Sequence, residues 1–274
     1  MMSFIDDSLL KIPALVVLRQ TETTVCGSMR DAVRWLKPRQ VKKADAIVLS
    51  DPCGLVYKSL AADFKRMDYS VKMLNVADFS DRSAKYNPIS YIKSEADILV
   101  IALAIIRGTK GHADSGNIRF LTAEKLLIAS LIGYVHDAAS EDDFNLCSVL
   151  AMLRNMISSG DLPDGYKTAV DYMIETKEEI SPGSSCASLY AQFKDLAGNG
   201  KNKVAASCIK RLLPLETTGI GEHMTNDELG LNSLQIDNTA LFVRSNPCPC
   251  LKFIIPLIYM QLFNIIGRQS KLLP

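Results

Sequence analysis

The chain has 274 residues, of which 48% are hydrophobic and 22% charged, and its net charge is +1. This ordinary globular composition excludes a disordered, collagen-like or low-complexity protein, and the length allows one large domain or two. The near-zero net charge excludes a global electrostatic footprint for nucleic acid or an anionic membrane, while a local basic face stays open.

The first third of the chain alternates strand and helix patterns. Short apolar runs and apolar residues at helical spacing predict five elements: a strand over Pro13–Leu18, a helix capped by Ser28 that ends at Leu36, a strand over Ala44–Ser50, a helix over Leu55–Met67 and a strand over Ser70–Asn75. The last three form a βαβ unit, which implies parallel pairing. Ligands bind outside the carboxyl ends of such strands, so residues 50–54 and 75–78 are candidate site positions.

The middle of the chain shows helical patterns and no strand. Six helices are predicted, over Glu95–Arg107, Phe120–Asp137, Phe144–Ser158, Tyr166–Lys177, Ser185–Leu196 and Val204–Leu213. A strand pattern returns at Thr239–Arg244, and an apolar helix follows over Leu251–Ile266. The predicted organisation is an α/β domain with an all-helical insert: residues 1–92 begin the α/β domain, 93–214 form the insert and 215–274 return to the α/β domain.

The compartment is predicted from the cysteines and the apolar stretches. Seven sparse cysteines in a chain of this length are typical of reduced thiols in the cytosol. The first ten residues contain Asp6 and Asp7 and no basic region before an apolar run, so no secretory signal is visible. Leu251–Ile266 is shorter than the ~20 residues of a membrane span, so a buried helix and a cytoplasmic protein without a membrane span are predicted.

Most catalytic motifs are missing. A P-loop needs G-x-x-x-x-G-K-[ST] between a strand and a helix, and the nearest similar segment, residues 198–202 (GNGKN), follows a predicted helix. His112, His136 and His223 have no metal-ligand spacing, and Cys248 and Cys250 have no second pair nearby. No metal site and no nucleophile elbow are therefore predicted.

Two basic clusters are candidates for contacts with phosphate or DNA. The first contains Arg34, Lys37, Arg39, Lys42 and Lys43, and the second contains Lys201, Lys203, Lys210 and Arg211. The alternative for both clusters is a solvated charged face.

Several stretches, in order along residues 25–267, resemble one family. Residues 46–54 (AIVLSDPCG) are similar to a strand and turn that read VVTDPKGE, and residues 69–75 (YSVKMLN) with 86–92 (YNPISYI) are similar to GYKVKVLN and YNPLDYI. The stretches 120–127 (FLTAEKLL), 225–234 (TNDELGLNSL), 239–242 (TALF) and 259–263 (YMQLF) are similar to FWEKAETALL, STDELDLDSL, KTALF and LYTQLF. All of these patterns occur in the TraG-type coupling proteins, the conjugative DNA-transfer ATPases of type IV secretion systems.

The resemblance implies a partial RecA-like P-loop NTPase fold, a parallel sheet that carries an all-helical inserted domain. Family members are usually hexameric ATPases that use ATP and Mg²⁺, bring relaxase-bound DNA to the secretion channel and are anchored at the inner face of the bacterial membrane by helices. The homo-oligomeric state of this chain stays open.

This sequence departs from the family at the nucleotide site. Counted back without gaps from residues 36–38 (LKP), which resemble the family's VKP, Asp31 and Ala32 stand where the P-loop lysine and threonine are expected. The remnant of the site then consists of Gly27, Ser28, Asp31, Asp51 and Gly54. Cys53 and Leu55 replace the lysine and glutamate of the family's turn, and the family's Walker B segment would come after Pro274.

The first hypothesis is therefore a degenerate, truncated coupling protein that binds relaxase, other conjugation proteins or single-stranded DNA. It would have no catalytic residues and no cofactor, because phosphoryl transfer depends on the positioning and charge stabilisation that those groups supply. The second hypothesis is half of a split coupling ATPase that another chain completes. The third is an unrelated soluble α/β binding protein.

Overall fold

The chain divides into two compact units. A computed structural model describes residues 13–18, 23–36, 45–76, 83–109, 117–157, 167–217, 219–234, 236–244 and 252–270. The sheet unit comprises Met1–Tyr86, Glu228–Cys248 and Ile258–Pro274, and the helical unit comprises Asn87–Asp227 and Pro249–Leu257. The domain boundaries predicted from the sequence stay a prediction.

A five-stranded sheet forms the centre of the sheet unit. Its strands are β1 (Leu15–Leu18), β2 (Thr23–Cys26), β3 (Ala46–Ser50), β4 (Ser70–Asn75) and β5 (Thr239–Arg244). They lie in the order β2-β1-β3-β5-β4. Strands β3, β5 and β4 are parallel, whereas β1 is antiparallel to both of its neighbours. The sheet is therefore mixed.

Three features of the sheet correct the sequence analysis. The predicted parallel sheet is only partly parallel, because the four residues between β1 and β2 are too few for a parallel crossover. Strand β2 was not predicted, because its side chains are exposed or half-buried and its sequence, TTVC, gives no apolar run. Strands β3 and β4 do not pair directly, since β5 lies between them.

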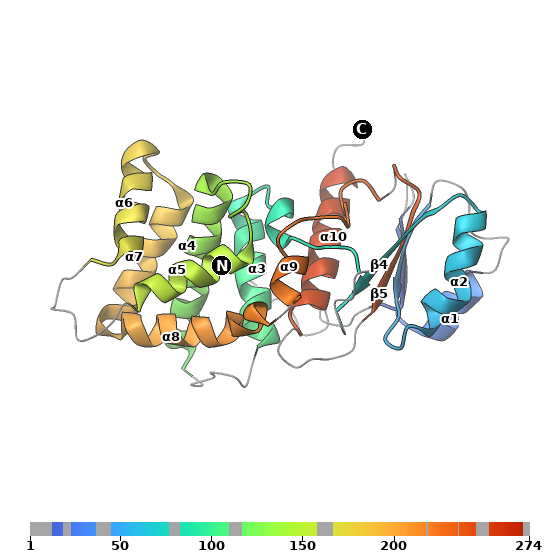
Figure 1. Cartoon of the computed structure of the whole chain (residues 1–274), viewed down its shortest axis with the longest axis horizontal. Coiled ribbons are helices and arrows are strands. Elements are labelled where there is room, and N and C mark those ends of the chain that lie inside the picture. Colours follow the sequence, from blue (N-terminus) through green and yellow to red (C-terminus); the bar gives the residue numbers. More distant parts are fainter. Residues whose placement is uncertain are drawn as a thin grey trace. The chain divides into compact units, whose positions relative to one another are not determined.

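Helices cover both faces of this sheet. Helices α1 (Met29–Trp35) and α2 (Leu55–Arg66) lie on one face, and residues 258–270 of α10 (Ile254–Ser270) lie on the other (Figure 1). The face under α2 holds an aromatic cluster, in which the ring centroids of Tyr57 and Phe242 are 5.3 Å apart. Strands β1 and β3 are buried along their whole length. Two-sided burial explains why their sequences are continuous apolar runs.

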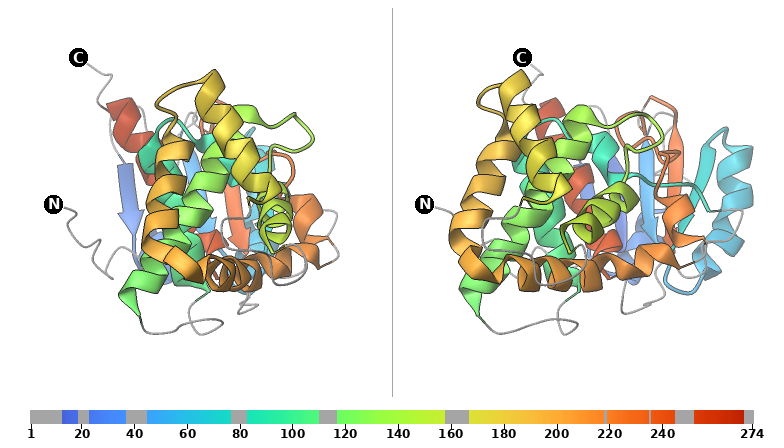
Figure 2. Two further views of the ribbon diagram at one scale, coloured as in Figure 1. Left: turned by 90° about the vertical axis from the view of Figure 1, so that its left-hand side faces the viewer. Right: turned by 60° about the vertical axis from the view of Figure 1, so that its left-hand side comes forward.

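Within the described residues, the helical unit has six long helices that match the six predicted ones. They are α3 (Glu95–Gly108), α4 (Ile118–Ala138), α5 (Leu146–Met156), α6 (Ala169–Ile180), α7 (Ser185–Ala197) and α8 (Lys201–Leu212), with short turns η2 (Pro88–Tyr91), η3 (Gly198–Gly200), η4 (Leu213–Glu216) and α9 (Ile220–His223). Helix α4 is buried on most sides, and α8 runs across one end of the bundle (Figures 1 and 2). Across the residues that the structure describes, no helix has the length and apolarity that a membrane crossing requires.

A buried ion pair connects three helices of this unit. The guanidinium of Arg211 on α8 donates two hydrogen bonds to the Glu124 carboxylate on α4, at 2.9 and 2.8 Å. It also donates to the Oγ1 of Thr109, the C-cap residue that follows α3, at 2.9 Å. Both charged side chains are fully buried. Arg211 is therefore unavailable to phosphate, which corrects its placement in the second basic cluster.

Two further sequence features, the cysteines and the glycine-rich segment 198–200, can be placed in the structure. The five cysteines in the described ranges are free thiols. Cys248 and Cys250 lie outside those ranges. The glycine-rich segment 198–200 forms the turn between α7 and α8, so it joins two helices rather than a strand and a helix.

Candidate functional site

The predicted nucleotide residues lie at one edge of the sheet. Because β1 is antiparallel to both β2 and β3, these two neighbours run in the same direction. The carboxyl ends of β2, β3, β5 and β4 therefore all lie at this edge. Cys26 at the end of β2 and Leu49 near the end of β3 are both registered with Leu15. Two strand spacings, about 10 Å, separate their backbones. The structure thus places Gly27 and Ser28 on the same edge as Asp51 and Gly54, with one strand between the two groups.

Asp51 closes the N-terminus of α2. Its carboxylate accepts hydrogen bonds from the backbone N–H groups of Val56 and Tyr57, at 3.1 and 2.8 Å, and its side chain is buried. First-turn N–H groups are the donors with which a helix N-terminus binds phosphate. In α2 two of those donors are taken by a carboxylate of the chain itself.

Two structural features favour a glycine at position 54. It precedes α2 with φ +71°, a left-handed conformation that side chains disfavour. A Cβ built on it would lie 3.3 Å from the Nε atom of Arg244, the last residue of β5. The close approach of Arg244 and the sharp turn into α2 account for the glycine at position 54 without any ligand.

The N-terminus of α1 is closed in a similar way. The Ser28 hydroxyl donates to the Asp31 carboxylate at 2.6 Å and accepts from the Asp31 backbone N–H at 3.2 Å. Burial raises the pKa of the nearby Cys26 thiol, and the negative charge of Asp31 raises it further. The negative charge of Asp31 at the N-terminus of α1 therefore disfavours an added anion there.

Replacing Asp51 with alanine is expected to destabilise the sheet unit by about 1–2 kcal/mol, because two helix donors lose their acceptor. Asp51→Asn keeps one acceptor oxygen, so a smaller loss is expected. Urea denaturation followed by fluorescence measures both, since the single tryptophan, Trp35, packs against the core of this unit. Equal stability of wild type and Asp51→Ala would show that the cap contributes nothing.

The other predicted contacts fall outside this edge or outside the described ranges. Lys37, Arg39, Lys42 and Lys43 lie in residues 37–44, outside the described residues, as do residues 77 and 78. Within the described ranges, no group of three or more His, Cys, Asp or Glu side chains is placed to hold a metal ion.

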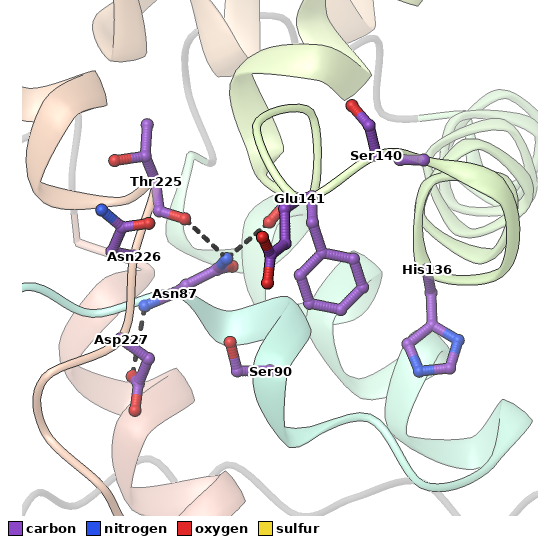
Figure 3. A pocket seen from close by; sticks show the side chains of 10 residues that line it. Asn87, Ser90, His136, Ser140, Glu141, Thr225, Asn226 and Asp227 are labelled. Atoms are coloured by element: carbon purple, nitrogen blue, oxygen red, sulfur yellow. Dashed lines mark hydrogen bonds between the residues drawn. The ribbon is translucent and has the colours of Figure 1, made fainter.

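The helical unit contains a pocket of about 340 Å³ that the sequence analysis did not predict. It is lined by Asn87, Ser90, His136, Ala139, Ser140, Glu141, Phe144, Thr225, Asn226 and Asp227. Figure 3 shows the 225–227 segment on one side, the loop with Ser140 and Glu141 on another, and Asn87 between them.

Asn87 holds the walls of this pocket together. Its side-chain N–H groups donate to the backbone carbonyls of Phe144 and Thr225, at 2.6 and 3.0 Å. Its backbone N–H donates to the Asp227 carboxylate at 3.3 Å, and Tyr91 donates its hydroxyl to the same carboxylate. One buried amide thus fixes three segments that are far apart in the sequence.

The signal for this pocket was present in the sequence but was assigned no role. Asn87 and Tyr91 belong to the stretch YNPISYI, and Asp227 belongs to TNDEL. Just before the first of these stretches, the Lys85 backbone N–H donates to the Glu228 carboxylate at 3.0 Å within the sheet unit.

Comparisons with known proteins give one family. The family model described as "Type IV secretory system Conjugative DNA transfer" matches residues 37–271. The match includes the pocket and Asp51, whereas β1, β2 and α1 precede it. A search of curated proteins found no significant match.

Proposed function

The chain belongs to the type IV secretory system conjugative DNA transfer family, and we propose that it acts there by binding partners rather than by hydrolysing ATP. We also propose that the sheet unit is part of a RecA-like fold. The parallel strands β3, β5 and β4, with helices on both faces, support that assignment.

The observation that carries the proposal is the position of Asp51. ATP and Mg²⁺ are the ligands that the family implies, and a triphosphate needs unoccupied N–H donors and a positive potential. The Val56 and Tyr57 donors point at the Asp51 carboxylate instead. Asp31 adds a second carboxylate at the neighbouring helix start. The residues at this edge do not fit the phosphates, so no catalytic step is assigned to them.

The partners follow from the family and from the chemistry of the units. Relaxase, other conjugation proteins and single-stranded DNA are the proposed partners, and the cytoplasm is the proposed place of action. The helical unit is the proposed binding module, because it contains the pocket at its polar surface. Lys37, Arg39, Lys42 and Lys43 stay the proposed contacts for DNA phosphate.

Calorimetric titration of Mg-ATP and of ADP into the purified chain tests this proposal. No heat of binding is expected up to about 1 mM nucleotide, which corresponds to less than about 4 kcal/mol of binding free energy. The same titration with Asp31→Asn serves as a control for charge repulsion alone. Micromolar binding to the wild type would contradict the proposal and favour the split ATPase that another chain completes.

A further inference from the structure

We propose that the pocket around Asn87 binds the guanidinium group of an arginine side chain from a partner protein. This inference rests on the proposed function, since it names the chemistry of one partner contact. It concerns the helical unit alone, so it stands apart from the nucleotide question at the sheet edge.

The charge of the pocket favours a cation. Its lining, as far as the structure describes it, includes the carboxylates of Glu141 and Asp227 and no lysine or arginine. The loop that contributes Glu141 also carries the exposed acidic residues Asp142 and Asp143. A phosphate group or a DNA backbone would be repelled here, whereas a guanidinium would gain charge-assisted hydrogen bonds.

The two carboxylates are arranged differently, and both arrangements suit a bound cation. Asp227 is held in place by the Asn87 backbone N–H and by the Tyr91 hydroxyl, so its position is fixed before any ligand arrives. Glu141 is exposed, and its carboxylate has no hydrogen-bond or ion-pair partner among the described residues. Glu141 can therefore turn toward a ligand without breaking a contact.

The rings of the pocket favour a planar cation over a compact one. The His136 and Phe144 ring centroids are 5.9 Å apart with an interplanar angle of 43°, and both residues line the pocket. A guanidinium stacks on such ring faces and offers five donors in one plane, whereas an ammonium is a strongly hydrated point charge. Arginine is accordingly preferred to lysine.

The size of the pocket fits one side chain. Pockets for drug-sized ligands span roughly 300–1,000 Å³. At about 340 Å³ this one lies at the lower end of that range. It is therefore large enough to receive a single anchoring side chain from a protein surface.

A titration followed by NMR tests the proposal. The probe is the peptide acetyl-Gly-Ser-Arg-Ser-Gly-amide, added to the ¹⁵N-labelled chain, with the citrulline and lysine versions of the peptide in parallel. Saturable shifts are expected at the amides of Asn87, Glu141 and Asn226. The citrulline peptide, which keeps the shape and loses the charge, is expected to bind about tenfold more weakly. The arginine peptide is expected to lose affinity between about 0.05 and 0.5 M salt.

Variants locate the site. Glu141→Gln is expected to weaken binding of the arginine peptide about threefold to fivefold, the effect of one partly exposed charge pair. Phe144→Leu is expected to reduce the preference for arginine over lysine. Glu179→Gln, an exposed residue of α6 outside the pocket, is the matched control and is expected to bind like wild type.

Several results would overturn the proposal. They are equal binding of the arginine and citrulline peptides, stronger binding of the lysine peptide, or an affinity that Glu141→Gln leaves unchanged. Peptide shifts that map outside the pocket would overturn it too. None of these results bears on nucleotide binding, so failure here leaves the calorimetric test of the proposed function unaffected.

Discussion

Replacing Glu124 with alanine is expected to destabilise the helical unit by about 3–5 kcal/mol, the effect of leaving one buried charge without its partner. The Arg211 guanidinium would lose both of its carboxylate acceptors while it stays fully buried. The backbone carbonyls of Ile106 and Thr109 and the Thr109 hydroxyl would be its remaining contacts. Urea denaturation followed by far-UV circular dichroism measures the loss, because most of the long helices belong to this unit.

Two controls separate this buried pair from an ordinary ion pair. Glu216→Ala removes the partner of Arg154 in a pair whose side chains are 50% and 45% exposed, and about 0–1 kcal/mol is expected. The double replacement Glu124→Met with Arg211→Met is expected to be less harmful than Glu124→Ala, since no unpaired charge stays buried. Equal free energies of unfolding for Glu124→Ala and Glu216→Ala would contradict the buried ion pair between Glu124 and Arg211.

Gly108→Ala is expected to cost about 3 kcal/mol, at the upper end of the range for overpacking. A Cβ at Gly108, the last residue of α3, would lie 2.5 Å from backbone atoms of Phe253. Backbone cannot move aside as a flexible side chain can, and Phe253 is buried. Segment 252–257 would have to separate from α3.

The matched control for this prediction is Gly200→Ala. Gly200 also lies at a helix end in the helical unit, has an ordinary φ of −87° and has nothing within 4 Å of a built Cβ. Its replacement is expected to change stability by less than about 1 kcal/mol. Equal urea midpoints for Gly108→Ala and Gly200→Ala would show that Phe253 does not pack against α3.

The helices could be predicted from the sequence because local signals specify them. Ser28 accepts from the Asp31 N–H at the start of α1, and Asn145 accepts from the Cys147 N–H at the start of α5. Such caps lie within three residues of the groups that they satisfy, so a local pattern is enough to find them. The buried strands β3 and β5 were found for an equally local reason, their continuous apolar runs.

What could not be predicted depends on residues far apart in the sequence. The position of β5 between β3 and β4 and the clustering of Asn87 with Phe144 and Thr225 are contacts across long separations. Arg211 is a different case. It shares the buried face of α8 with Val204 and Cys208, at helical spacing, so the pattern itself could have indicated its burial.

The carboxylates of Asp31 and Asp51 at the sheet edge lie at different positions relative to their helices. The structure has Asp51 in the turn before α2 and Asp31 in the first turn of α1, as the predicted helix bounds imply. The acceptance of helix N–H groups by Asp51 was not predicted, although an acidic residue before a helix is a cap by preference. A nucleotide-binding role for Gly27, Ser28, Asp31, Asp51 and Gly54 stays a prediction from the family resemblance.

The most direct test of whether Asp51 excludes phosphate from α2 is ¹H–¹⁵N NMR of the Val56 and Tyr57 amides as Mg-ATP is added. If Asp51 occupies these donors, their resonances are expected to stay unchanged up to about 1 mM nucleotide. Their hydrogen exchange is expected to stay slow with and without nucleotide. Saturable shifts at both amides, in the wild type, would show that phosphate displaces the Asp51 carboxylate and would contradict the proposal that this chain acts without ATP.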